Sequence, residues 1–207
     1  MNTSAFKPAA GDCLLVIDVQ NDFCTGGALA VPEGEAVVPG INALMAEFDK
    51  VVLTQDWHPA GHSSFASEHA GQEAFGTIEM PYGPQTLWPD HCIQGTHGAA
   101  FHPDLDNRPA QLIIRKGFRK AIDSYSAFHE NDHSTSTGLA GWLRERKVQR
   151  VVCVGLAHDF CVRFSAVDAR REGFDTVVIE SLTRAIDLDG SRDAARAAMR
   201  EAGVVLI

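Results

Sequence analysis

Six short runs of mainly apolar, β-branched residues recur along the chain, and helical patterns lie between most of them. The runs cover residues 13–18, 50–55, 111–115, 150–155, 175–180 and 203–207. Strands that are apolar at nearly every position are typical of parallel sheets covered on both faces. We therefore expect an α/β fold with a doubly wound, mainly parallel six-stranded sheet and helices on both of its faces.

The segments between these runs differ in kind. Apolar residues recur at helical spacing at about residues 37–48, 137–147, 160–172 and 190–201. The stretch from Asp56 to Ala110 is rich in Gly, Pro and His and has no sustained period, so we interpret it as one long, functional, metal-binding loop insertion. No linker or internal repeat divides the chain, and we expect a single domain over residues 1–207.

Composition and charge argue against several classes of function. The formal net charge of −9 does not suit a nucleic-acid-binding protein, which needs a basic face. No apolar run is long enough to predict a membrane span, and the first residues lack the apolar core of a secretion signal. Five cysteines at irregular spacing fit a reduced, cytoplasmic protein better than a disulfide framework. The sequence leaves a homo-oligomer open.

Chemically versatile side chains follow four of the predicted strands. Ligands in open α/β sheets bind beyond the carboxyl ends of the strands, so residues at these ends are expected to meet in one crevice. These residues are Asp18, Asp56, Lys116 and the turn "GLAHDFC", which ends at Cys161. The sequence therefore predicts a site that combines two carboxylates, a lysine and a thiol.

Cys161 is the candidate nucleophile. A free cysteine is most often a small buried hydrophobe, and this interpretation suits Cys153 inside a predicted strand. Cys161 instead lies at the predicted start of a helix, where the helix dipole favours a thiolate. Asp18 is placed to accept the thiol proton, and the charge of Lys116 would stabilise the thiolate. We interpret this set as the machinery of a thiol hydrolase.

The stretch "DWHPAGHSSF" is the candidate metal site, because Asp56, His58 and His62 combine a carboxylate with imidazoles. These donors suit Zn, Mn or Fe(II). A fourth ligand could come from the same loop, where spacing does not select among His69, His91, His97 and His102. The alternative is a polar loop with scattered histidines. Since the thiol set suffices for nucleophilic attack, we expect the metal to orient the substrate or a water.

Longer motifs resemble a known family over nearly the whole chain. They are "LLVIDVQNDFCTGGALAV", "TQDWHPAGHSSFAS", "LWPDHCIQGTHGAAFHPDL", "IRKGFRKAIDSYSAF" and "VGLAHDFCVRFSAVDARREGF". The chain resembles nicotinamidases of the isochorismatase-like cysteine hydrolase superfamily. The first and last motifs also occur, more loosely, in relatives with other substrates. The D-W-H-P-x-x-H and "WPDHC" blocks are much more specific to nicotinamidases.

This resemblance implies roles for the candidate residues and adds others. The implied catalytic triad is Asp18, Lys116 and Cys161. The implied ligands of one divalent ion (Zn, Fe or Mn) are Asp56, His58, His62 and His91. The implied substrate pocket has a pyridine ring between Phe23 and Trp88, with Tyr125 lining it. The implied oxyanion hole consists of the backbone N–H groups of Ala157 and Cys161.

The implied reaction is hydrolysis of a small amide, nicotinamide and also pyrazinamide, through a thioester on Cys161, as a step in NAD salvage. The resemblance also implies a cis peptide bond between Leu156 and Ala157. The turn that is usually A-T-D-x-C in the family is "AHDFC" here. His158 therefore replaces threonine, which leaves the triad intact but changes the contacts beside it.

Three alternatives use the same residues differently. Related cysteine hydrolases act on N-carbamoyl compounds, ureidoacrylates or isochorismate, and they need not have the metal-binding histidines. A catalytically inactive binding protein on the same fold would be expected to lack a triad residue. A redox-sensing thiol would place Cys161 near a resolving cysteine such as Cys24 or Cys92. An assay for ammonia release separates the hydrolase from the inactive binding protein.

Overall fold

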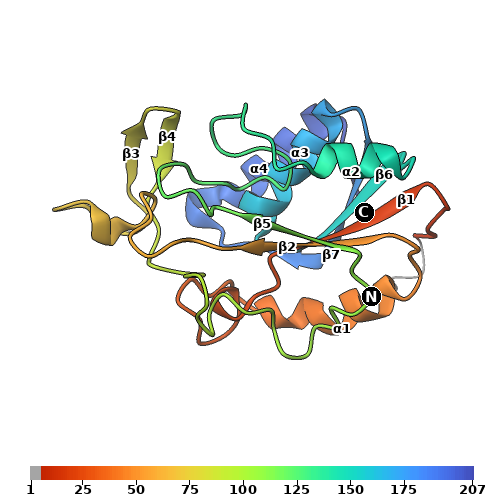
Figure 1. Cartoon of the computed structure of the whole chain (residues 1–207), viewed down its shortest axis with the longest axis horizontal. Coiled ribbons are helices and arrows are strands. Elements are labelled where there is room, and N and C mark those ends of the chain that lie inside the picture. The colour runs from red at the N-terminus through yellow and green to blue at the C-terminus, as the bar shows by residue number, and fades with distance from the viewer. Residues whose placement is uncertain (1–5) are drawn as a thin grey trace.

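A six-stranded sheet forms the centre of the computed structural model, which describes residues 6–207 (Figure 1). Its order is β5-β2-β1-β6-β7-β8, and all neighbouring strands pair in parallel. The strands are β1 (Asp12–Ile17), β2 (Val51–Asp56), β5 (Leu112–Lys116), β6 (Arg150–Leu156), β7 (Asp175–Arg184) and β8 (Val205–Leu206). The predicted fold class is confirmed.

Helices cover both faces of this sheet (Figure 1). They are α1 (Val38–Met45), α2 (Leu139–Glu145), α3 (Arg163–Arg171) and α4 (Ser191–Glu201). Successive side chains of β1 point to opposite faces, so Leu14 joins the core that contains Ile41 of α1. Leu15 joins the second core, with Leu143 of α2 and Met199 of α4. The central strands β1 and β6 are apolar at nearly every position because they are buried on both sides, whereas the edge strand β5 exposes Ile113 and Arg115.

The long insertion contains structure that the sequence analysis did not predict. Strands β3 (Thr77–Met80) and β4 (Gly83–Thr86) form an antiparallel hairpin that extends from the end of the molecule (Figure 1). Most of its side chains are exposed or half-buried, and Gly83 and Pro84 lie in its second strand. Such a hairpin has no apolar alternation, so periodicity could not reveal it.

Single turns complete the secondary structure and position parts of the site. Four are 3₁₀ turns, η1 (Asn21–Phe23), η2 (Gly34–Val37), η3 (Ala66–Glu68) and η5 (Leu188–Gly190). The fifth is a π-helical turn, η4 (His158–Val162), which leads directly into α3. The helix predicted from residue 160 therefore begins as a wider turn, a feature that is frequent at functional sites.

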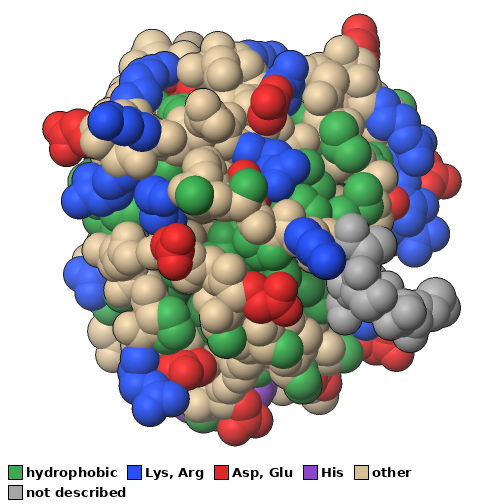
Figure 2. Space-filling model, turned by 90° about the vertical axis from the view of Figure 1, so that its right-hand side faces the viewer, with side chains coloured by type: hydrophobic (Ala, Val, Ile, Leu, Met, Phe, Trp, Pro, Cys, Tyr) green, Lys and Arg blue, Asp and Glu red, His purple; other side chains and the backbone are tan. Residues whose placement is uncertain are grey.

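The surface in Figure 2 has basic and acidic side chains interspersed with apolar ones. Within residues 6–207, the helices lack the combined length and apolar character that crossing a bilayer requires. All five cysteines are free and buried.

Candidate active site

Four ionisable side chains meet at the carboxyl edge of the sheet, where the ammonium group of Lys116 contacts the other three. The Nζ atom of Lys116 lies 2.8 Å from Oδ2 of Asp18 and 3.1 Å from Oδ1 of Asp56. The same Nζ atom lies 3.4 Å from Sγ of Cys161. All four residues are buried, so these charges interact in a medium that screens them weakly.

Asp18 is held in a strained position directly after β1. Its φ angle is 48°, in the left-handed region that side chains other than glycine rarely adopt. Thr54 of β2 fixes the carboxylate, because its hydroxyl donates a 2.5 Å hydrogen bond to Oδ1 and accepts one from the Asp18 backbone N–H. Burial raises the pKa of Asp18, while the charge of Lys116 lowers it. A carboxyl group poised in this way suits proton transfer.

The Cys161 thiol lies in η4, and its surroundings shift its pKa in favour of the protonated form. Burial raises its pKa well above the usual thiol value, and the nearby carboxylates of Asp18 and Asp56 raise it further. Lys116 acts in the opposite direction. Burial and the two carboxylates thus outweigh the lowering of the thiol pKa that is expected at the start of a helix. Ionisation of the thiol therefore needs a base such as Asp18.

Three candidate metal ligands converge on one point beside this cluster. The Nε2 atoms of His58 and His91 lie 3.1 Å and 3.3 Å from Oδ2 of Asp56. The other ring nitrogen of each histidine hydrogen-bonds a backbone carbonyl, Gly117 O at 3.0 Å and Pro89 O at 2.7 Å. Since a carbonyl only accepts, each Nδ1 carries the proton and, in the neutral ring, each Nε2 presents a lone pair. This donor set fits a cation.

Gly117 gives His58 the room it needs. A Cβ atom at this position would lie 2.4 Å from Cε1 of the His58 ring, and the φ angle of Gly117 is 66°. Any other residue would displace the ring that carries one of the three converging nitrogen and oxygen donors.

His62 and Asp123 form a second group with His58, and Oδ1 of Asp123 lies 4.0 Å from the same Nε2 atom of His58 that faces Asp56. His62 uses both ring nitrogens within the protein, with Nδ1 2.8 Å from Ser64 Oγ and Nε2 2.9 Å from Arg119 O. His62 groups with His58 and Asp123, and not with the Asp56–His58–His91 set. Asp123 was not a candidate from the sequence, because it lies in a segment without periodic pattern. The structure thus brings together three of the four expected ligands and places His62 in an adjoining group.

Aromatic side chains form a pocket above Cys161. Trp88 and Tyr125 pack edge to face at 6.1 Å between ring centroids, and Phe23 packs against His91 at 5.6 Å. A fourth aromatic residue of the pocket, Phe160, lies 4.8 Å from Trp88 between ring centroids. The sequence analysis missed Phe160, although it directly precedes Cys161. The pocket is lined by Phe23, Leu29, Asp56, His58, Trp88, His91, Asp123, Tyr125, Ala157, Phe160, Cys161 and Ile186.

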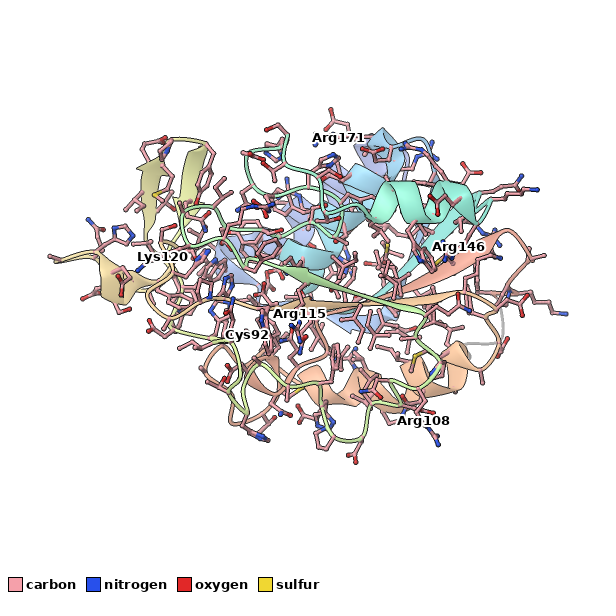
Figure 3. The ribbon with its side chains drawn as sticks, in the orientation of Figure 1. Cys92, Arg108, Arg115, Lys120, Arg146 and Arg171 are labelled. Atoms are coloured by element: carbon pink, nitrogen blue, oxygen red, sulfur yellow. The ribbon has the colours of Figure 1, made fainter. Side chains whose placement is uncertain are left out.

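The loop that carries His91 is anchored to the end of β2. Cys92, labelled in Figure 3, lies with its Sγ atom 3.4 Å from Nε2 of Gln20. Gln20 also hydrogen-bonds the backbone N–H and carbonyl of Asp56, at 2.7 Å and 2.8 Å. Cys92 thus fills a structural position, and burial raises its pKa well above the usual value.

Comparison with known proteins identifies the family. The model of the isochorismatase domain matches residues 12–207. The chain belongs to the isochorismatase family.

Several members of this family are close to the chain. A nicotinamidase of Acinetobacter baylyi is 54% identical over 96% of this chain and 92% of its own length. A solved nicotinamidase/pyrazinamidase of Acinetobacter baumanii has a TM-score of 0.95, with 55% identity over 97% of each chain. A protein of L. infantum solved with nicotinate has a TM-score of 0.85, with 43% identity over 98% of this chain and 95% of its own. A pyrazinamidase of Pyrococcus horikoshii solved with zinc has a TM-score of 0.78, with 33% identity over 95% and 98%.

Within this isochorismatase-family chain, the turn after β6 has a distinctive residue. The Leu156–Ala157 peptide bond is cis, as the resemblance implies. His158 follows it and is buried, with Nδ1 2.9 Å from the Thr183 hydroxyl. That hydroxyl donates to the Glu180 carbonyl, so His158 donates to it from Nδ1. The residue that departs from the family's usual turn is thus tied to β7 and lies outside the pocket lining.

Proposed function

We propose that this chain is an amidohydrolase that converts nicotinamide and water to nicotinate and ammonia through a thioester on Cys161. The observation that carries the proposal is the position of Lys116, whose ammonium group contacts both Asp18 and the Cys161 sulfur at the floor of an aromatic pocket. The names of the relatives, which are nicotinamidases and pyrazinamidases, support the same activity.

The proposed chemistry begins with proton transfer from Cys161 to Asp18. The thiolate attacks the amide carbonyl, and Asp18 then passes the proton to the leaving ammonia, which leaves a thioester. Asp18 next takes a proton from water, and the resulting hydroxide attacks the thioester carbonyl. The carbon–sulfur bond then breaks, the acid is released, and the proton on Asp18 returns to the Cys161 thiolate. Lys116 favours the ionised thiolate during this sequence because it adds a buried positive charge beside the sulfur.

The turn that contains Cys161 would stabilise the developing oxyanion. We propose that the backbone N–H groups of Ala157 and Cys161 form this oxyanion hole. Preorganised donors of this kind contribute ~3 kcal/mol each to transition-state stabilisation. Phe23 and Trp88 are proposed to enclose the pyridine ring, with Tyr125 as a further wall, because all three line the pocket that opens on the thiol.

We propose one divalent ion, Zn, Fe or Mn, held by Asp56, His58 and His91, with His62 as the fourth protein ligand expected from the family. The converging lone pairs of His58 and His91 support a cation there, and the zinc-bound P. horikoshii structure supports a divalent one. His62 would have to release Arg119 O or Ser64 to take part. A bound ion would supply an open coordination position that recognises the ring nitrogen.

We further propose that the chain acts as a single domain in the cytoplasm, in NAD salvage, and that pyrazinamide is a second substrate. A homo-oligomer is compatible with this role. The small-molecule substrate is supported by the relative solved with nicotinate.

Ammonia release from a small panel of amides tests the proposal. The panel contains nicotinamide, pyrazinamide, benzamide and an N-carbamoyl amino acid, with metal analysis of the same sample. We expect nicotinamide to have the highest specificity constant. Preference for the N-carbamoyl compound would assign the chain to another branch of the cysteine hydrolases, and no ammonia from any amide would contradict an amidohydrolase.

A further inference from the structure

A fully buried glutamine lies on the β3–β4 hairpin, whose other residues are exposed or half-buried. Gln85 of β4 has no exposed surface, whereas Thr77 and Glu79 on the paired strand are exposed. The hairpin extends from the end of the molecule in Figure 1, so the burial of a polar side chain on it needs a physical explanation. Burial of an amide is costly unless its donors and acceptors find partners.

The Gln85 amide is surrounded by partners on both of its ends. Its Nε2 atom lies 2.7 Å from Oδ2 of Asp123, 2.7 Å from the Thr86 carbonyl and 2.8 Å from Oη of Tyr125, so these three acceptors share its two N–H groups. Its Oε1 atom accepts hydrogen bonds from Asn131 Nδ2 at 3.1 Å and from Tyr82 Oη at 3.2 Å. The donors at Oε1 fix the orientation of the amide, so that its N–H groups face the pocket residues.

The segment 123–125, which Gln85 holds, contacts the Lys116 ammonium group and lines the pocket. Asp123 and Tyr125 both line the pocket, and the Ser124 carbonyl between them accepts a 3.2 Å hydrogen bond from Lys116 Nζ. Trp88 donates from Nε1 to the same Tyr125 hydroxyl, at 3.1 Å. Gln85 thus bonds the segment at both of its ends, and both Gln85 and Trp88 donate to the Tyr125 hydroxyl oxygen.

We propose that Gln85 is a positioning residue that fixes the aromatic wall formed by Tyr125 and Trp88 for a pyridine-carboxamide substrate. This inference rests on the proposed function. Gln85 does not line the pocket and acts through the Tyr125 hydroxyl. If the aromatic side chains are already held in place, less conformational entropy is lost when the substrate binds. This gain in binding free energy is the same in the substrate complex and in the transition state. Loss of the anchor therefore raises KM more than it lowers kcat.

The test substitutes Gln85→Met, which keeps the length of the side chain but removes its hydrogen bonds. We expect KM for nicotinamide to rise about tenfold while kcat changes less than about threefold. Gln85→Glu keeps the shape but places an acceptor beside Asp123, and we expect it to raise KM at least as far. The matched control is Gln111→Met, which removes an exposed amide bonded to Asp49 O at the opposite edge of the sheet.

A double-mutant cycle asks whether Gln85 acts through Tyr125. Tyr125→Phe removes the oxygen that receives the Gln85 hydrogen bond and keeps the ring. If the two residues act as one unit, the KM increase of the double variant Gln85→Met, Tyr125→Phe equals that of the larger single variant. Increases that multiply would overturn the proposal.

Two further measurements separate positioning from other effects. Thermal melting and metal content are recorded for each variant. A lower melting temperature with unchanged KM would overturn the proposal, because the role of Gln85 would then be structural alone. A KM increase that disappears on addition of Zn²⁺ would also overturn it, because the effect would pass through metal occupancy. Failure of the proposed function would be visible in the unaltered protein, which would not hydrolyse nicotinamide.

Discussion

Lys116 and Asp18 form an ion pair at 2.8 Å in which both side chains are completely buried. Although burial lowers the pKa of Lys116, the charges of Asp18 and Asp56 raise it well above its usual value, which favours the ammonium form. The Cys161 sulfur lies against the same nitrogen. Lys116 therefore lowers the pKa of the Cys161 thiol and Asp18 raises it. Substitutions of the two residues should shift this pKa in opposite directions.

Asp18→Asn separates thiol ionisation from catalysis. The substitution removes a carboxylate that raises the pKa of Cys161, so this pKa should fall and alkylation at neutral pH should become faster. Amide hydrolysis should nevertheless drop by about 100- to 10,000-fold, because no base remains to move the proton. Iodoacetamide kinetics against pH, together with ammonia release, check both parts. Retained turnover would remove Asp18 from the role of base.

Lys116→Met should have the opposite effect on the thiol. Loss of the cation raises the pKa of Cys161 further, so the alkylation profile should shift to higher pH. The substitution also leaves the buried carboxylates of Asp18 and Asp56 without their cation, and the free energy of unfolding should fall by about 3–5 kcal/mol. Urea denaturation measures this loss. An unchanged alkylation profile in a folded variant would contradict the role of Lys116.

His158 should make stability depend on pH. Burial lowers its pKa below the usual value near 6.5, so the unfolded chain takes up the proton first as the pH falls. The contribution of neutral His158 is fully present above about pH 6.5 and is lost as the pH falls toward its folded-state pKa.

The matched variant for this effect is His158→Gln, with His97→Gln as an exposed control. Between pH 7.5 and pH 5, values chosen to bracket about 6.5, the unaltered protein should lose more unfolding free energy than His158→Gln does. Other buried histidines are common to both proteins and cancel in the difference. Parallel stability curves would show that His158 does not carry the dependence.

Metal removal tests how the ring nitrogen is recognised. The ratio of the specificity constants for nicotinamide and benzamide is measured before and after chelation. We expect the ratio to be large with metal and to collapse without it, because benzamide lacks the ring nitrogen while the thiol chemistry is separate. A ratio that stays large in folded, metal-free protein would assign the ion a structural role.

The part of the site that follows the strands could be predicted from the sequence. Asp18, Asp56 and Lys116 each lie at the end of a predicted strand, and parallel strands bring such ends together. Thr54 could also have been found, since it is the first polar residue after the apolar residues 51–53 and lies near the carboxyl end of the strand. Its hydroxyl is what holds the Asp18 carboxylate.

The remainder depends on tertiary contacts that leave no periodic signal. Asp123 and Gln85 lie in irregular or exposed segments, and their positions are set by hydrogen bonds across 38 residues of sequence. Likewise, spacing treats His62 and His58 as equivalent, but His62 is engaged by Ser64 and a backbone carbonyl. The local sequence pattern indicates which side chains could take part in a site. The tertiary packing of the loops determines which of them come into contact.

Cys161→Ala, with Cys153→Ala as its matched control, tests the central claim most directly. Cys153 is buried inside β6 and its substitution should lower stability while leaving ammonia release intact. Acid-quenched mass spectrometry during turnover of nicotinamide should find one nicotinoyl group on Cys161 in the unaltered protein. Cys161→Ala should form no adduct and release no ammonia. Turnover by Cys161→Ala at the rate of the unaltered protein would contradict the account.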